Sequence, residues 1–211
     1  MVHAGPGLTT RNHEIIHENG NIVLVAGASQ AEMRVCSTML SKASNVFRAM
    51  LSGAFAEGQQ LSTQSPTMIP LPDDDAKSLR CLCYVTHGII PAVPARLSLN
   101  EFGAMAIVAD KYDCQQYFKP FLYVWVYEGF SPATATLNTR FLLASATYFF
   151  SEPTLFRRLT RLLVLEHVWR SNELEGLVKN TETSIVSTKI VGKCRRTWGS
   201  TLATDTTNSR T

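Results

Sequence analysis

Residues 33–58 read MRVCSTMLSKASNVFRAMLSGAFAEG, and this stretch decides the fold class. Its first residues are those of a strand, and from Ser37 the apolar residues recur at helical spacing. Ser44 can cap a second short helix, which Gly53 would end. The sequence therefore predicts a strand followed directly by two short helices.

The residues before this stretch predict a hairpin. Asn21–Ala26 form a short apolar run rich in β-branched residues, and Gly27–Gln30 supply turn chemistry before the next strand. Residues 1–20 are polar and carry neither pattern clearly. We therefore expect a flexible lead over residues 1–20, with His13 and His17 inside it.

A third strand and a further helix are predicted after the two short helices. Residues 68–71 read MIPL, and Pro70 restricts this strand to a sheet edge or a strand end because proline has no N–H to donate. Asp73–Asp75 favour the start of a helix, where acidic residues suit the helix dipole. Gly88 is expected to end that helix.

Several helices follow. Residues 98–101 read SLNE and form a capping box, which predicts a helix from this point. Asp113 is expected to cap the next helix, with Pro120 either near its start or kinking it. Residues 130–178 predict a helical extension, and the Ser/Thr-rich, basic residues 179–211 predict a largely disordered tail.

Composition excludes several classes of protein. The chain has 211 residues and a net charge of +3, too small an excess for a dedicated nucleic-acid binder. Five cysteines without paired spacing favour reduced thiols, and no apolar run is long enough for a membrane helix. We expect an intracellular protein of the cytoplasm or nucleus with no membrane segment.

Two longer motifs resemble one family. The stretch at 33–58 resembles the second strand and first helix pair of the BTB/POZ domains of fungal proteins. Residues 97–114, LSLNEFGAMAIVADKYDC, resemble the helix of that family whose end carries an ADKYDC-type signature. With IPLPDDD at 69–75 and KPF at 119–121, the resemblance covers residues 21–129. The run RRLTRLLVLEH at 157–167 resembles the helical segment that follows the domain in such proteins.

The resemblance implies an α+β protein. It predicts a BTB/POZ domain, a small mixed sheet flanked by helices, over residues 21–129. An all-α extension over 130–178 and a flexible tail would follow. The implied function is a non-enzymatic protein–protein interaction module with no catalytic residue, metal, cofactor or small-molecule substrate. The partner would be a cullin, with the chain a substrate adaptor for a cullin–RING ubiquitin ligase, or another BTB chain in a self-associating scaffold such as a homodimer.

The resemblance also implies two sets of site residues. The family's charged pocket at the dimer interface corresponds to Asn21 and Ser37, neither of which is charged here, so dimerisation of the usual kind lacks its ion pair. The family's apolar-x-Glu motif for docking onto a cullin corresponds to Phe55 and Glu57. An alternative is that Phe55 packs onto its own core.

Other patterns have simpler interpretations. Cys81, Cys83, His87 and Cys114 are zinc-type ligands, but alternate helical positions point apart, so we expect reduced thiols and no metal site. The aromatic residues of 118–127 occupy more than one helix face. We expect them to be mainly core, with the rest covered by the helices that follow.

Overall fold

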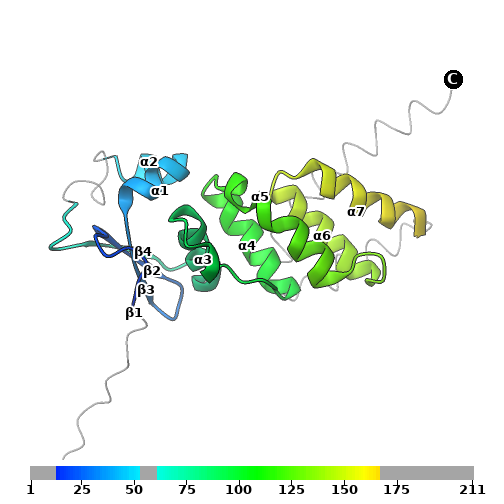
Figure 1. Cartoon of the computed structure of the whole chain (residues 1–211), viewed down its shortest axis with the longest axis horizontal. Coiled ribbons are helices and arrows are strands. Elements are labelled where there is room, and N and C mark those ends of the chain that lie inside the picture. Colours follow the sequence, from blue (N-terminus) through cyan, green and yellow to red (C-terminus); the bar gives the residue numbers. More distant parts are fainter. Residues whose placement is uncertain (1–12, 53–60, 167–211) are drawn as a thin grey trace, which may run out of the picture. The chain divides into compact units, whose positions relative to one another are not determined.

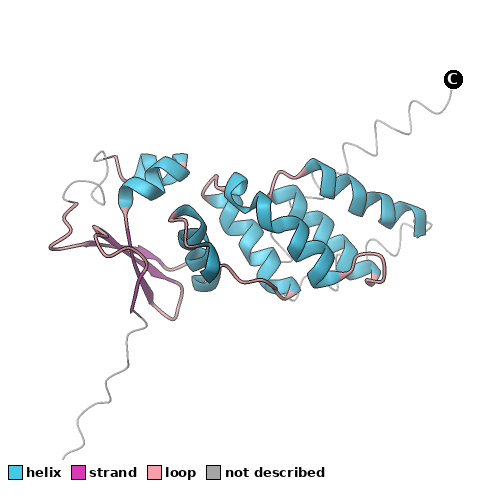
Figure 2. Cartoon of the chain, viewed as in Figure 1, coloured by secondary structure: helices cyan, strands magenta, loops and turns pink. Residues whose placement is uncertain are grey.

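The computed structural model describes residues 13–52 and 61–166, and it confirms the predicted α+β fold class. The chain divides into two compact units, Met1–Ala92 and Val93–Thr211. This division falls inside the predicted 21–129 domain. In the described residues every strand belongs to the first unit, and the second contains helices alone (Figure 2).

The first unit is a small mixed sheet with helices around it (Figure 1). Its elements are β1 (His13–Ile15), β2 (Ile22–Ala26), β3 (Ala31–Val35), α1 (Ser37–Ala43), α2 (Asn45–Met50), β4 (Thr67–Leu71), α3 (Ala76–Thr86) and η2, a 3-10 helix (Ile90–Ala92). Helix α1 contacts both α2 and α3, and α3 also contacts β3. Fully buried side chains from the strands and helices form the core: Leu24, Met33, Leu40, Phe47, Ile69, Leu79 and Leu82.

The predicted hairpin is confirmed. Strands β2 and β3 pair antiparallel from Ile22 opposite Val35 to Ala26 opposite Ala31. The connecting turn needs positive φ angles, which Gly27 (63°) supplies at its start and Gln30 (48°) at its end. Buried and exposed residues do not alternate along either strand, because both faces of the hairpin are covered.

The third predicted strand, β4, lies at a sheet edge as Pro70 required. The strand order is β1-β3-β2-β4, and β4 pairs parallel with β2, placing Pro70 opposite Val25. On the outer side of an edge strand there is no neighbouring strand, so a proline there leaves no hydrogen bond of the sheet unmade. The local sequence rule and the sheet topology therefore agree.

The expected flexible lead is wrong for residues 13–20. His13–Ile15 form β1, which pairs parallel with β3, and the backbone N–H groups of Ile16 and His17 both donate to the carbonyl oxygen of Arg34. An edge strand with little burial has no apolar alternation, which is why the sequence pattern missed it. Residues 1–12 lie outside the described residues.

The helix starts of the first unit follow the predicted chemistry. The Ser44 side chain accepts from the backbone N–H of Phe47 at the start of α2, and Asp75 accepts from Ser78 at the start of α3. Gly88, with φ 73°, ends α3 in a Schellman motif. Helix α2 ends at Met50, with Leu51 as its C-cap, and Gly53 lies outside the described residues.

The second unit is a group of helices (Figures 1 and 2). Its elements are α4 (Leu99–Lys111), α5 (Gln115–Tyr123), η3, a π-helix (Val124–Gly129), α6 (Leu137–Phe149) and α7 (Pro153–Glu166). The predicted capping box of α4 is confirmed, because Ser98 and Glu101 bond reciprocally. Helix α6 contacts both α4 and α7.

Asp113 does not cap the helix that follows it. Its φ of 53° is left-handed, its N–H donates to Asp110, and the next N–H, from Cys114, donates to Ala109. This is a Schellman motif, in which an Asp tolerates the left-handed conformation at the end of α4. The sequence expectation was wrong because the same residue types favour both helix starts and left-handed helix ends.

The aromatic stretch is only partly core. Phe118 and Trp125 are buried, and the Trp125 indole N–H donates to the carbonyl oxygen of Pro94 at 2.8 Å. Tyr123 and Tyr127 are exposed, so the expectation that the following helices cover the remaining rings is wrong for these two. Pro120 lies inside α5, and the π-helix η3 begins four residues after it, at Val124.

The predicted extension over 130–178 is described as far as Glu166 and is helical there, as α6 and α7. Arg140 of α6 is buried and donates to the carbonyl oxygens of Pro132 and Ala133, which fixes the connection between η3 and α6. Residues 167–178 and the predicted tail at 179–211 lie outside the described residues.

Candidate functional site

The structure brings Asn21 and Ser37 together within the chain. The Asn21 Nδ2 group donates to the Ser37 hydroxyl, and the backbone N–H of Ser37 donates to Asn21 Oδ1, both at 2.9 Å. Asn21 immediately precedes β2, whereas Ser37 is the first residue of α1. The two residues therefore join the sheet to the helix pair within the first unit.

This pair is neutral and satisfies its own polar groups. Ser37 is buried, and Asn21 provides the acceptor that the first turn of α1 otherwise lacks, because its N-cap residue, Cys36, makes no side-chain cap. The charged pocket that the resemblance implies would bring an ion pair to a dimer interface, and these two neutral side chains bring none. Their clearest role is in fixing α1 on the sheet.

The predicted cullin-contact residues, Phe55 and Glu57, lie outside the described residues. The chain is described up to Ser52, just after α2, and again from Leu61, before β4. The expectation for these two side chains therefore stays a prediction.

A histidine provides a second connection between elements of the first unit. The backbone N–H of Cys36, between β3 and α1, donates to His87 Nε2 at 3.0 Å. On the other side of the ring, His87 Nδ1 lies 2.8 Å from the carbonyl oxygen of Cys83 in α3. These contacts require Nε2 to accept and Nδ1 to donate, so they select one neutral tautomer.

The surroundings of His87 favour this neutral form. Burial lowers the pKa of His87, and the nearby His17 lowers it further, with the ring centroids 5.9 Å apart, against the opposing effect of the bond to Cys83. Protonation at Nε2 would turn that nitrogen into a donor facing the donor N–H of Cys36. The neutral ring thus holds the start of α1 to the end of α3.

Strand β1 is attached to α3 by a polar network. Tyr84 of α3 donates to Glu14 Oε1 at 2.5 Å, and Arg80 Nε lies 2.7 Å from Glu14 Oε2. Burial, followed by the hydrogen bond to Glu14, raises the pKa of Tyr84 to about 12. A further polar contact joins β1 to β3, because His13 Nδ1 lies 3.1 Å from Glu32 Oε2.

The cysteines do not form a metal site in the part of the chain that the structure describes. Residues 13–52 and 61–166 hold no group of three or more ligand-type side chains placed for an ion. Cys81 and Cys83 are buried, and burial raises the pKa of Cys81 to about 12, so this thiol stays protonated.

Exposed apolar side chains lie at both edges of the sheet. Ile15 of β1 is 56% exposed and Met68 of β4 is 53% exposed, while Val46 of α2 is also exposed. Edge strands carry backbone groups available for pairing with another chain. Both edges of the described sheet therefore carry an exposed apolar side chain.

The resemblance singled out Asn21 and Ser37 as positions of a dimer interface, but it did not predict their hydrogen bonds to one another, and sequence reasoning missed two other contacts. It gave no role to the hydrogen bonds of His87 or to the network of Glu14, Arg80 and Tyr84. Glu14 and Tyr84 are 70 residues apart, and no local pattern records such a pairing.

Comparison of the sequence with protein-family models and with curated proteins finds no match. Across the described ranges, no helix combines the length and the apolar character that crossing a bilayer requires. The BTB/POZ resemblance therefore stays a prediction based on the motifs at 33–58 and 97–114.

Proposed function

We propose that the chain is an intracellular, non-enzymatic interaction module of the BTB/POZ type, acting as a substrate adaptor for a cullin–RING ubiquitin ligase. The observation that carries this proposal is the order of elements in the first unit. A hairpin, two short helices, a strand and a helix follow one another from β2 to α3, the order that the resemblance implied.

In this proposal the cullin contacts the segment just after α2. Phe55 would provide an apolar anchor that fills a pocket of the partner, as interface hot spots commonly do, and Glu57 would place a charge beside it. The helices after Gly129 would enlarge the contact surface. Catalysis is not part of the proposal, because the motifs that carry the resemblance belong to a binding fold.

The alternative is a self-associating scaffold without a ligase role. The exposed Ile15 and Met68 at the two sheet edges favour it, because an edge strand can pair with a second copy of the chain. The neutral pair of Asn21 and Ser37 does not provide charge-assisted dimerisation. Self-association would therefore depend on backbone pairing and apolar packing.

One measurement distinguishes the two functions. Light scattering after size exclusion gives the mass of the chain alone and of its mixture with the N-terminal domain of a cullin from the same source. A complex of defined stoichiometry supports the adaptor function. A dimer or larger species that leaves the cullin separate supports the scaffold instead, and a lone monomer in both runs contradicts both proposals.

Two substitutions test the placement of the cullin contact. Phe55→Ala and Glu57→Lys should each weaken the complex, and loss of an aromatic anchor should cost about 2 kcal/mol, or about 30-fold in the dissociation constant. Isothermal titration calorimetry measures the affinity, and circular dichroism checks that the chain remains folded.

Matched controls are available on exposed positions of the first unit. Val46→Ala removes apolar surface from α2, and Glu18→Lys makes the same charge change as Glu57→Lys. Both controls should bind the cullin as the parent chain does. If Phe55→Ala and Glu57→Lys also bind unchanged, the cullin does not dock at this segment.

A further inference from the structure

The exposed large apolar side chains of the second unit gather in one place. Among its described residues these are Tyr123, Val124 and Tyr127, each at least 36% exposed, at the end of α5 and in η3. The rings of Tyr123 and Tyr127 stack, with centroids 6.1 Å apart and planes inclined by 18°. Stacking gives these exposed rings a fixed orientation before any partner binds.

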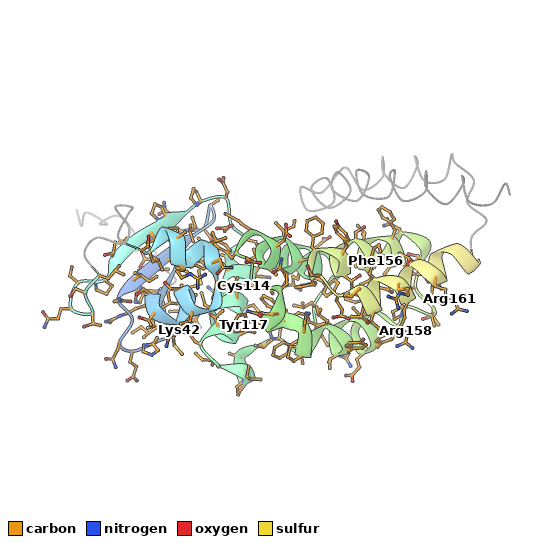
Figure 3. The ribbon with its side chains drawn as sticks, turned by 90° about the horizontal axis from the view of Figure 1, so that it is seen from above. Lys42, Cys114, Tyr117, Phe156, Arg158 and Arg161 are labelled. Carbon is orange, nitrogen blue, oxygen red and sulfur yellow. The ribbon has the colours of Figure 1, made fainter. Side chains whose placement is uncertain are left out.

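A cation from another helix extends this surface. The Arg158 guanidinium carbon of α7 lies 5.5 Å from the centroid of the Tyr127 ring. Arg161 lies three residues after Arg158 on α7, and its side chain is also exposed (Figure 3). We call Tyr123, Tyr127, Arg158 and Arg161 the Tyr–Arg surface.

The arginines of this surface keep hydrogen-bonding capacity. Among the described side chains of residues 61–162, neither Arg158 nor Arg161 forms an ion pair with a carboxylate. A guanidinium that stacks on a ring can still donate from its edge, in the fork geometry that fits a carboxylate. Tyrosine and arginine are also the residue types most enriched in interface hot spots.

We propose that the Tyr–Arg surface binds an acidic segment of a partner protein, one in which Asp or Glu residues alternate with apolar side chains. The carboxylates would pair with Arg158 and Arg161, and the apolar groups would cover Tyr123 and Tyr127. This surface is separate from Phe55 and Glu57, so the proposal goes beyond the proposed function and does not depend on it.

Two other occupants fit the charges less well. A nucleic acid requires many phosphate contacts, but residues 93–166 contain seven basic and six acidic side chains, so this part of the chain is nearly neutral. The chain's own residues 179–211 contain six basic and two acidic side chains, which do not complement a basic surface.

Fluorescence anisotropy of the full chain tests this proposal. The probe is a labelled peptide rich in Glu that also contains Leu and Trp, compared with the same peptide carrying Gln in place of every Glu. We expect binding of the Glu peptide alone, weakening as salt screens the charges. The double variant Arg158→Glu, Arg161→Glu should weaken it at least about ten-fold.

Further variants separate the surface from general charge and from folding. Lys42→Glu reverses an exposed charge on α1 of the first unit and should leave the affinity unchanged. Arg158→Gln with Arg161→Gln removes the charges without reversing them and should weaken binding while circular dichroism stays unchanged.

Four results would overturn the proposal. The first two are no binding of the Glu peptide, and binding of the Gln peptide as tight as that of the Glu peptide. The other two are a loss of affinity in Lys42→Glu as large as in the arginine variants, and tighter binding of single-stranded RNA than of the Glu peptide through the same arginines. A fifth would assign the surface to the chain itself. If Glu173→Gln with Glu175→Gln increases peptide affinity, the acidic residues of 172–175 occupy it in place of a partner.

Discussion

At the scale of single residues, His87 has the most specific surroundings in the first unit. Its two ring nitrogens contact Cys36 and Cys83, and both contacts need the neutral ring. Cys81, Cys83 and His87 are residues of the types that bind zinc, so the sequence raised the question of a metal site. In the structure His87 instead bonds to backbone groups, which explains why a histidine is useful at this position without any metal.

The lowered pKa of His87 predicts that stability falls at acidic pH. The unfolded chain takes up a proton near pH 6.5, whereas the folded chain resists it, so the unfolded state binds more protons below that pH. The contribution of His87 to the unfolding free energy is complete above pH 6.5. It is lost as pH falls below 6.5, by at most about 1.4 kcal/mol per pH unit.

Urea unfolding between pH 8 and pH 5 measures this dependence. His87→Gln should flatten the pH profile, because the group that titrates differently in the two states is gone. His13→Gln is the comparison variant: it removes the pair of His13 with Glu32 and leaves the ring contacts of His87 in place, so the contribution of a second histidine is measured separately. An equally steep profile in His87→Gln would assign the pH dependence to other groups.

At the scale of elements, α1 depends on a residue from another element for its first turn. Its own N-cap residue, Cys36, makes no side-chain cap, and Asn21 accepts the hydrogen bond of the Ser37 N–H. Helices α2, α3 and α4 are instead capped locally by Ser44, Asp75 and Ser98. The start of α1 is therefore coupled to the sheet, whereas the starts of α2, α3 and α4 are capped by residues of their own segments.

Asn21→Ala should lower the unfolding free energy by about 1 to 2 kcal/mol, because it leaves the Ser37 N–H and hydroxyl without their partner at a buried site. Asn21→Asp retains the acceptor and should recover most of the loss. Asn19→Ala, two residues earlier at an exposed position, should change little. Guanidinium unfolding measures all three, and a neutral Asn21→Ala would argue against the cap.

At the scale of the whole molecule, the helices after Gly129 complete an aromatic core in the second unit. Phe150, which follows α6, lies 5.4 Å from Phe102 and 5.8 Å from Phe118 between ring centroids. All three side chains are buried. A chain that ends at Gly129 would lose one side of this cluster while keeping α4 and α5.

A fragment of residues 1–129 should therefore expose apolar surface and aggregate, with increased binding of a hydrophobic dye. Light scattering after size exclusion compares it with a fragment of residues 1–166, which retains α6 and α7 and should remain monodisperse. A monodisperse 1–129 fragment would indicate that the core of the second unit does not need the later helices.

The sequence by itself determined most of the local structure. The hairpin at 21–36, the edge position of β4 and the capping box at Ser98 all follow from residue chemistry that acts within a few positions. Where two local rules compete for one residue type, the prediction failed, as at Asp113. The α+β fold class followed from the order of these elements and from the resemblance.

Only the tertiary structure decided the contacts between distant segments. The polar lead contains β1 because Glu14 reaches Arg80 and Tyr84 in α3, and His87 gains its role from Cys36, 51 residues away. Tyr127 is exposed beside Arg158 because helix packing left that face uncovered. Hydrogen bonds and packing between elements depend on the folded geometry, which periodicity and capping signals along the chain do not encode.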